Sequence, residues 1–244
     1  MQNSDILALA GLRVDGRRPD ELRSLRMNFS ATNDADGSVY YEQGLNKILV
    51  NVHGPREPPR RAEDEGKGVL SVAVVNAPFS GSEWKKRGKS DRRNAEIERT
   101  IRDTFEGVVL LSLYPKSEIS VVIHLLESDG SVLCAMINAV SLALINAAVA
   151  MSDMVVSCSI GYEPKRKQLI QDASQVEQGS GGAYLPIAIK CRSEDILLIQ
   201  LDSRLDVDVL ESAMQMAIDG CRKYSQIFER ELKEHMKSHA TIEK

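Results

Sequence analysis

Two adjacent arginines, Arg92 and Arg93, have a position that suggests anion binding. They come just before or within the first turn of an expected helix, where unpaired backbone N–H groups and the positive end of the helix dipole favour an anion. Two guanidinium groups at this place would add charge-assisted hydrogen bonds to a phosphate. The alternative is an exposed basic turn without a ligand, because charged runs usually mark a solvated surface.

A second candidate anion site lies in the segment Glu127–Ser131, between an expected strand and an expected helix. Gly130 and Ser131 can offer backbone N–H groups and a hydroxyl to an anion at the start of that helix. Most turns of this composition only cap the helix, so the pattern alone leaves both roles open. The glycine-rich segment 179–182 lacks the Lys-Ser/Thr of a P-loop and the spacing of a dinucleotide fingerprint, which favours a plain hairpin loop.

The four histidines and four cysteines predict no metal site, and no cofactor motif is found. His235 and His239 are four residues apart, but they lie in a polar tail without the Glu of a zinc-peptidase helix, so we expect them to be exposed to solvent. The cysteines are widely spaced, and Cys134 and Cys158 lie in apolar runs that favour core packing. No Ser/His/Asp or Cys/His arrangement stands out.

Composition predicts a globular protein without a strong bulk attraction to nucleic acid. The chain has 244 residues, of which 43% are hydrophobic and 27% charged, enough for one large core or two small lobes. Its net charge is −4, but basic residues cluster at 13–26, 56–61 and 85–93, which allows a local basic groove. The opening residues lack the pattern of a signal peptide, so we expect a reducing, intracellular compartment.

Alternating apolar residues predict several strands. The first two should pair through a turn at Leu45-Asn46, and Gly54-Pro55 should end the second of them. The expected strand regions are 38–52, 69–75, 119–126, 154–162, 187–189 and 196–201. Residues 55–67 and 80–90 are expected to be exposed loops, and residues 1–20 to be irregular.

Three helices are expected. Ser90 can cap the first, whose apolar residues recur at helical spacing from Ile97 onwards. Residues 132–151 are apolar enough to resemble a membrane span, but small and polar residues interrupt them, which favours a helix buried in a core. The last helix should start at Asp206 or Asp208. Strands and helices thus alternate in two rounds, each closed by a long helix, which predicts an α/β (α+β) fold with two similar lobes of mixed sheet packed with helices.

Several segments together resemble the RNase PH family, and the likeness runs from Gly11 to the last helix. They are Gly11–Arg18, Ala35–Ser38, Glu42–Lys47, Gly54–Glu57, Pro78–Ser80, Asp91–Arg93, Asp129–Gly130 and Asn138–Leu144. The resemblance implies the two-lobed RNase PH fold. It implies a basic N-terminal extension over residues 1–20, a first lobe over 21–151, and a second lobe with the C-terminal helix over 152–244.

Active members of this family remove 3′ nucleotides from RNA by phosphorolysis, in which inorganic phosphate attacks the terminal phosphodiester. The resemblance places the RNA backbone on Arg92 and Arg93, and phosphate near Gly130 and Ser131. Active members carry an Arg directly after the latter pair, where this chain has Val132.

Two further departures concern acidic groups. Active members carry an Asp two residues before the position of Pro186, where this chain has Tyr184, and an acidic pair in the preceding loop is reduced to Glu177. Phosphate is an anion attacking another anion, so the site needs fixed positive charge. A tyrosine with a pKa of about 10 is a poor acid or metal ligand at neutral pH, and loss of one such group typically costs about 10² to 10⁴ in rate. We therefore expect no catalytic residues, no metal and no cofactor.

Within the family the chain resembles a ring subunit of the RNA exosome, which implies a non-catalytic role in a channel for single-stranded RNA. Arg60 and Arg61 would lie at the pore mouth, and Arg92 and Arg93 deeper inside. The implied partners are other RNase PH-like ring subunits, S1/KH-type cap subunits and a processive 3′–5′ exoribonuclease, with no membrane. The implied location is the nucleus and nucleolus, and also the cytoplasm.

Two other functions remain open at this point. The chain could be an active phosphate-dependent 3′–5′ exoribonuclease that uses Asp129, Asp172 or Glu177 as a substitute acid. It could also be a small-molecule α/β enzyme, although the basic clusters and the lack of a cofactor motif argue against that class. Phosphate-dependent release of nucleoside diphosphates separates the first alternative from an inert subunit.

Overall fold

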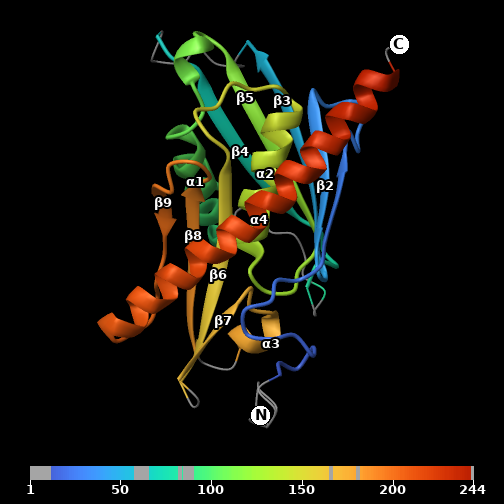
Figure 1. The fold of residues 1–244 in the computed structure, drawn as a ribbon. Helices are drawn as coiled ribbons and strands as arrows, with labels where there is room; N and C mark the ends of the chain where they lie inside the picture. Colours follow the sequence, from blue (N-terminus) through green and yellow to red (C-terminus); the bar gives the residue numbers. More distant parts are fainter. Residues whose placement is uncertain are drawn as a thin grey trace.

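The structure is a computed structural model that describes residues 12–57, 66–81, 84, 91–164, 167–179 and 182–242. Two β-sheets, one from each half of the chain, pack with helices into a mixed α/β architecture, which confirms the predicted fold class (Figure 1). The first sheet has the order β1-β2-β3-β5-β4, and its strands are Leu25–Phe29, Gly37–Gln43, Asn46–Arg56, Glu118–Glu127 and Val69–Asn76 respectively. The second has the order β7-β6-β8-β9, with strands Gln168–Gln171, Val155–Glu163, Ala183–Lys190 and Ile196–Ile199.

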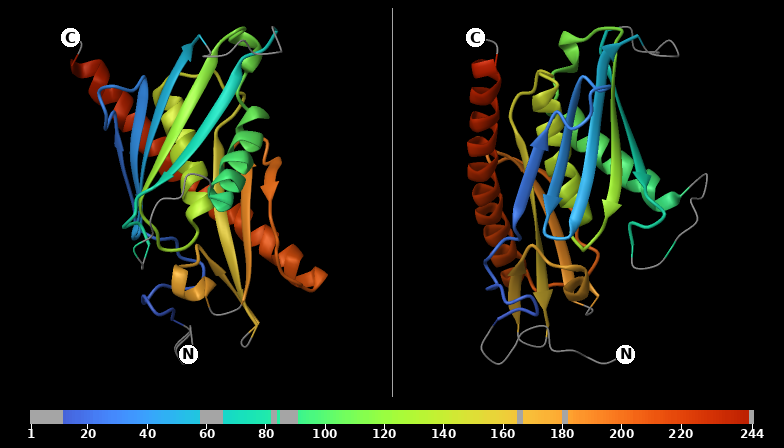
Figure 2. Two further views of the ribbon diagram at one scale, coloured as in Figure 1. Left: turned by 180° about the vertical axis from the view of Figure 1, so that it is seen from behind. Right: turned by 90° about the vertical axis from the view of Figure 1, so that its right-hand side faces the viewer.

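The helices include three long elements and two short ones. They are α1 (Arg92–Glu106), the 3-10 helix η1 (Leu111–Leu113), α2 (Val132–Asn146), α3 (Gln175–Gln178) and α4 (Val207–Ile242). Figure 2 shows α4 along one side of the molecule and α1 beside β4.

The first sheet follows its sequence pattern closely. In β3, Ile48, Val50 and Val52 are fully buried and alternate with partly exposed residues, and β5 repeats this pattern. A period of two places these side chains on one face, which packs against α2. The two strands pair in antiparallel register, with Val50 opposite Ile123.

The α2 helix lies between the two sheets and contacts β2 and β3 on one side and β6 and β8 on the other. Every residue from Cys134 to Leu144 is buried, which explains why the segment is apolar on all sides. The helix ends at Asn146 rather than at 151. Across the described residues, no helix is long and apolar enough to cross a membrane. One continuous core therefore joins both sheets.

The α4 helix closes the core. Tyr224 and Phe228 are fully buried, and Phe228 meets Tyr41 of β2 edge-on at 6.2 Å between ring centroids. Further along the helix, His235 stacks on Phe29 of β1 at 4.6 Å, so it is half-buried rather than fully exposed to solvent as expected. The expected core positions of Cys134 and Cys158 are confirmed.

Several expected boundaries were wrong by a few residues. The β2–β3 turn is at Gly44-Leu45, because Gly44 has a φ of +61° and Asn46 already pairs with Gln43. Strand β3 continues through Gly54-Pro55 to Arg56, since an irregularity between His53 and Arg56 accommodates a residue without an N–H. Strands β1 and β7, at one edge of each sheet, were not predicted.

The parallel pair β4 and β5 positions the candidate sites. Both strands end at the same edge of the sheet, with Asn76 opposite Leu125. The α2 helix starts just beyond β5. The α1 helix starts beside the end of β4, where the Asn76 side chain donates a hydrogen bond to Asn94 Oδ1 at 2.8 Å. The two candidate anion sites therefore lie at one edge of the first sheet.

Candidate functional site

Gly130 and Ser131 lie at the start of α2, as the sequence predicts, but both are buried. Gly130 has a φ of +68°, and a Cβ at this position would lie 2.5 Å from the backbone N of Gln175, so only glycine fits. The Ser131 hydroxyl donates to the carbonyl of Ala173 at 2.7 Å and lies 2.5 Å from the Ser159 hydroxyl. It does not cap the helix. The group that the resemblance assigns to phosphate is thus already engaged within the protein.

Tyr184 comes from β8 and faces the same place. Burial raises the pKa of the Tyr184 phenol well above its usual value; the nearby Cys134 thiol adds to this, while hydrogen bonds with Ser131 and Ser159 oppose it. The phenol therefore stays neutral at physiological pH and can neither bind a metal as an anion nor act as an efficient acid. The same surroundings raise the pKa of Cys134 to about 12, which keeps this thiol unreactive.

Val132 is the first residue of α2 and packs against the core. Its side chain adds no charge to the unpaired N–H groups at this helix start. The structure therefore brings Gly130, Ser131, Val132 and Tyr184 together, and their combination is apolar or hydrogen-bonded internally rather than cationic. None of these four residues carries a positive charge, whereas attack by phosphate on a phosphodiester needs fixed positive charge.

Arg92 and Arg93 form the first turn of α1 and are exposed. The helix is capped by Asp91, whose carboxylate accepts a hydrogen bond from the Arg93 backbone N at 3.1 Å, so the expected cap at Ser90 was wrong. Among the described residues neither guanidinium takes part in an ion pair, which leaves both able to bind an external phosphate. Arg60 and Arg61 lie outside the described residues.

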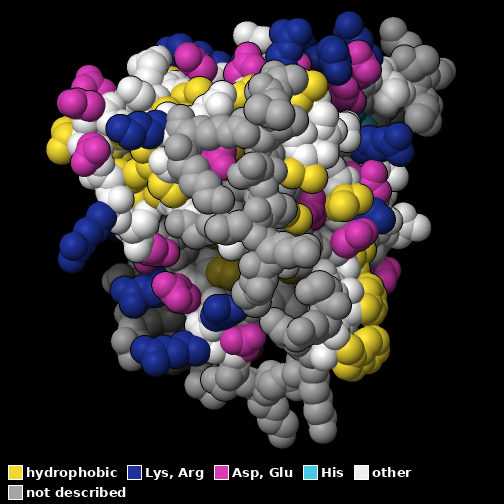
Figure 3. Space-filling model, turned by 90° about the horizontal axis from the view of Figure 1, so that it is seen from below, with side chains coloured by type: hydrophobic (Ala, Val, Ile, Leu, Met, Phe, Trp, Pro, Cys, Tyr) yellow, Lys and Arg dark blue, Asp and Glu magenta, His cyan; other side chains and the backbone are white. Residues whose placement is uncertain are grey.

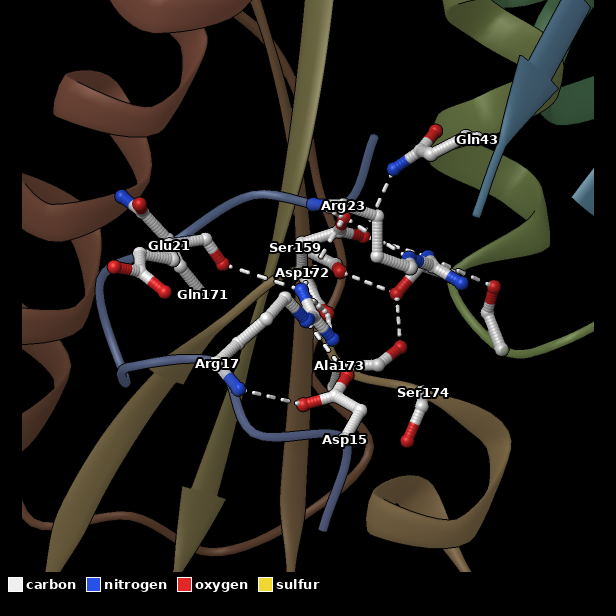
Figure 4. Close-up of polar contacts among 12 residues, drawn as sticks. Asp15, Arg17, Glu21, Arg23, Gln43, Ser159, Gln171, Asp172, Ala173 and Ser174 are labelled. Atoms are coloured by element: carbon white, nitrogen blue, oxygen red, sulfur yellow. Dashed lines mark hydrogen bonds and ion pairs between the residues drawn. The ribbon is translucent and has the colours of Figure 1, made fainter. Parts of the chain in front are cut away.

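Arg23, which the sequence groups with a basic surface cluster, is buried in a network around Asp172 (Figure 4). Its Nη2 and Nε lie 2.6 and 3.0 Å from the two Asp172 carboxylate oxygens, and Gln43 Nε2 donates to the same carboxylate at 2.8 Å. Gln43 also donates to the Tyr224 hydroxyl. The network therefore ties the first sheet, the loop after β7 and helix α4 to one another.

Arg13 forms a second buried pair. Its Nε and Nη2 contact the Glu177 carboxylate of α3 at 2.7 and 2.5 Å, and its Nη1 donates to the Gln171 carbonyl at 2.6 Å. Asp172 and Glu177 thus bind arginines in the interior, which makes both poor substitutes for a catalytic acid. Sequence reasoning missed these pairs, because their partners are about 150 residues apart and no local spacing links them.

The remaining surface charge does not form one basic field on the face shown in Figure 3. Lys and Arg side chains there are interspersed with Asp and Glu side chains. In the part of the chain that the structure describes, no cluster of three His, Cys, Asp or Glu side chains could hold a metal ion.

Comparisons with known proteins identify the relatives of this chain. Residues 21–150 match the RNase PH model, described as the 3′ exoribonuclease family, domain 1. The exosome complex component RRP41 of Homo sapiens is 34% identical over 239 residues, which is 97% of each chain. The exosome complex component Rrp41 of Thermococcus kodakarensis is 38% identical over 225 residues, covering 92% of this chain and 89% of that protein.

Solved structures share the fold. Rrp46 of rice (Oryza sativa) superposes with a TM-score of 0.81 at 22% identity, covering 91% of this chain and all of that one. A chain of the Archaeoglobus fulgidus exosome with RNA bound to the active site gives a TM-score of 0.77 at 24% identity, covering 90% and 93%. Given the family model matched over more than half of its length and relatives more than 30% identical over nearly all of it, the chain belongs to the RNase PH family, alongside proteins of the exosome component RRP41 type.

Proposed function

We propose that this protein is a non-catalytic ring subunit of the RNA exosome, and that it helps to guide single-stranded RNA to an associated 3′–5′ exoribonuclease. Ring membership is supported by relatives named as exosome components, which match nearly the whole chain. One observation supports the loss of chemistry above all others. Tyr184 faces Ser131, and the Ser131 hydroxyl is bonded to Ala173 and Ser159, so the place for phosphate is filled from within.

The proposed partners follow from the same assignment: other RNase PH-like subunits in the ring, S1/KH-type cap subunits, and a processive exoribonuclease. We also propose a location in the nucleus, nucleolus and cytoplasm. Purification of the tagged chain from its own cells should recover a stoichiometric assembly with related subunits. Recovery of the chain alone, as a stable monomer by light scattering, would contradict ring membership.

Arg92 and Arg93 are proposed to hold RNA phosphates in the channel. Replacing both with Gln in the assembled ring should weaken binding of single-stranded RNA. The plot of log association constant against log salt should also become less steep by about 1.4, because each phosphate contact with a single strand contributes about 0.7 to its steepness. Degradation of long RNA by the associated nuclease should slow more than that of short RNA. Fluorescence anisotropy over a salt series measures the first effect.

A matched control comes from the same helix. Arg99 and Arg102 are also on α1 but pair with Asp103 and Glu106 near its other end. Changing these two to Gln alters the net charge equally and should leave the salt slope unchanged. Equal losses in both double variants would show a general charge effect and would remove the support for Arg92 and Arg93 as phosphate ligands. The same test with Arg60 and Arg61 examines the proposed pore mouth.

A second candidate function, active phosphorolysis, rests on Asp129. Its side chain pairs with Arg23 at 3.6 Å but stays partly exposed, with 22% of its surface accessible, whereas Asp172 and Glu177 are buried against arginines. Asp129 lies directly before the Gly130-Ser131 pair and also lines a surface pocket. If the ring releases nucleoside diphosphates in a phosphate-dependent way and Asp129→Asn abolishes this, the active function is correct.

A further inference from the structure

A pocket of about 470 Å³ lies beside the degenerate phosphate site, and the proposed RNA channel gives it no role. It is formed by the β2–β3 turn, the loop after β4, the end of β5 and the start of α3. The lining is mixed, with Leu45 and Phe79 as apolar residues and Lys47, Glu127, Asp129 and Gln175 as polar ones. The volume falls in the range that small organic ligands occupy in proteins.

Hydrogen bonds between the lining segments hold the pocket open. Ser128 contacts the carbonyl of Ser80 through both its backbone N and its hydroxyl, each at 2.9 Å. The Asp129 backbone N donates to Asn46 Oδ1 at 2.5 Å, and its carbonyl accepts from Arg23 Nη1 at 2.6 Å. The walls are therefore fixed to the Arg23 network, so a ligand would meet a largely formed site.

Phe79 is the unusual member of the lining, because 61% of its surface is exposed. A solvated aromatic ring at the rim of a pocket can stack on a flat ligand, and nucleobases are such ligands. Both carboxylates are held in place by ion pairs, Glu127 with Lys47 at 2.8 Å and Asp129 with Arg23 at 3.6 Å, and each keeps further oxygen lone pairs. These remaining lone pairs can accept hydrogen bonds from the exocyclic amino groups of cytosine, adenine or guanine, as Asp and Glu do in nucleic-acid recognition.

The pocket lies at the same edge of the first sheet as the start of α1. Phe79 follows β4 by three residues, and the end of β4 is joined to the first turn of α1 through the Asn76–Asn94 hydrogen bond. A strand whose phosphates contact Arg92 and Arg93 would thus pass close to Phe79. We propose that this pocket receives one base of single-stranded RNA, with Phe79 as the stacking surface and Asp129 and Glu127 as acceptors for its amino group. The proposal rests on the proposed function, since it needs RNA to pass Arg92 and Arg93.

Binding of 5′-labelled A10, C10 and U10 RNA to the assembled ring tests the proposal. Phe79→Ala should weaken binding of A10 and C10 about 5-fold to 150-fold, the range for loss of one stacked base, and Phe79→Trp should preserve it. The parent should prefer A10 and C10 to U10, because uracil lacks an exocyclic amino group, and Asp129→Asn should reduce that preference. Ultraviolet irradiation should crosslink RNA to the tryptic peptide that carries Phe79.

Leu113→Ala is the matched control, because Leu113 is also 61% exposed but precedes β5, at the opposite end of that strand from the pocket. If Phe79→Ala changes affinity by less than about 2-fold while the Arg92 and Arg93 variant weakens binding, the pocket proposal fails and the RNA path stands. If neither variant matters, both fail. If Phe79→Ala alters ring assembly without altering RNA affinity, the pocket holds a segment of a neighbouring subunit and the proposal is overturned.

Discussion

Asp172→Ala should lower the free energy of unfolding by about 3–5 kcal/mol, because it removes the buried carboxylate nearest to the Arg23 guanidinium and leaves only the partly exposed Asp129, at 3.6 Å, to balance its charge. The Asp172 carboxylate is 1% exposed and binds Arg23 and Gln43. Its removal therefore leaves a cavity at the junction of both sheets and α4. Urea unfolding of the full chain, followed by circular dichroism, measures the change. Asp172→Asn keeps the shape and isolates the loss of charge.

The control for this experiment is Asp219→Ala. Asp219 pairs with Arg222 at 2.9 Å, but both side chains are half exposed, and such surface pairs contribute at most about 1 kcal/mol. An equal loss of stability in the Asp172 and Asp219 variants would mean that the interior network contributes no more than a surface ion pair. It would also remove the reason for treating Arg23 as structural.

The same network predicts a pH dependence. Burial alone would raise the pKa of Asp172, but hydrogen bonds and charge attraction from Arg23 outweigh burial and hold this pKa below its usual value. A carboxyl whose pKa is lowered by folding adds stability above its unfolded pKa of about 3.9, and that stability is lost as the pH falls through the folded pKa. The stability difference between the parent and Asp172→Asn should therefore be largest near neutral pH and narrow in acid. A constant difference down to pH 2 would contradict this assignment.

The sequence predicts the core strands and α2 well, because their patterns reflect burial directly. Ile48, Val50 and Val52 alternate with other residues because β3 has one buried face. The α2 helix is apolar on all sides because it is covered by a sheet on each side. Strand β1 does alternate, with Leu25, Met27 and Phe29 packed against the core, but over only five residues, and β7 has four, so both patterns are too short to stand out. The continuation of β3 past Pro55 depends on its pairing with β5, which local sequence does not contain.

Part of the candidate site could be predicted from the sequence, and part only from the structure. The resemblance locates Ser131 and Tyr184, but only the structure places them face to face, on elements about 50 residues apart. The structure also moves Arg13 and Arg23 from an expected basic surface to the interior. Composition shows that these residues are charged but not which acidic residues they pair with. Phe79 belongs to a matched segment of the family, yet no periodicity indicates that its ring is exposed at a pocket.

The largest effect on chemistry is expected from restoring the two missing groups. The parent ring component should show no phosphate-dependent release of nucleoside diphosphates from single-stranded RNA in magnesium. The double variant Tyr184→Asp, Val132→Arg should gain such release, since one group of this kind contributes about 10² to 10⁴ in rate. Replacing Tyr184 also removes the phenol that faces Ser131, which gives phosphate access to the start of α2.

A binding measurement keeps the site assignment testable if the rate remains too low to detect. An Arg at the first position of α2 opposes the helix dipole until an anion neutralises it, so inorganic phosphate should raise the melting temperature of the double variant and not that of the parent. Stabilisation by ligand follows mass action and reaches about 2.7 kcal/mol at 100 times the dissociation constant. Tyr184→Phe keeps the ring in place and should gain neither release nor phosphate binding. Phosphate-dependent release by the parent itself would overturn the non-catalytic assignment, and absence of both responses in the double variant would show that Gly130 and Ser131 do not form a phosphate site.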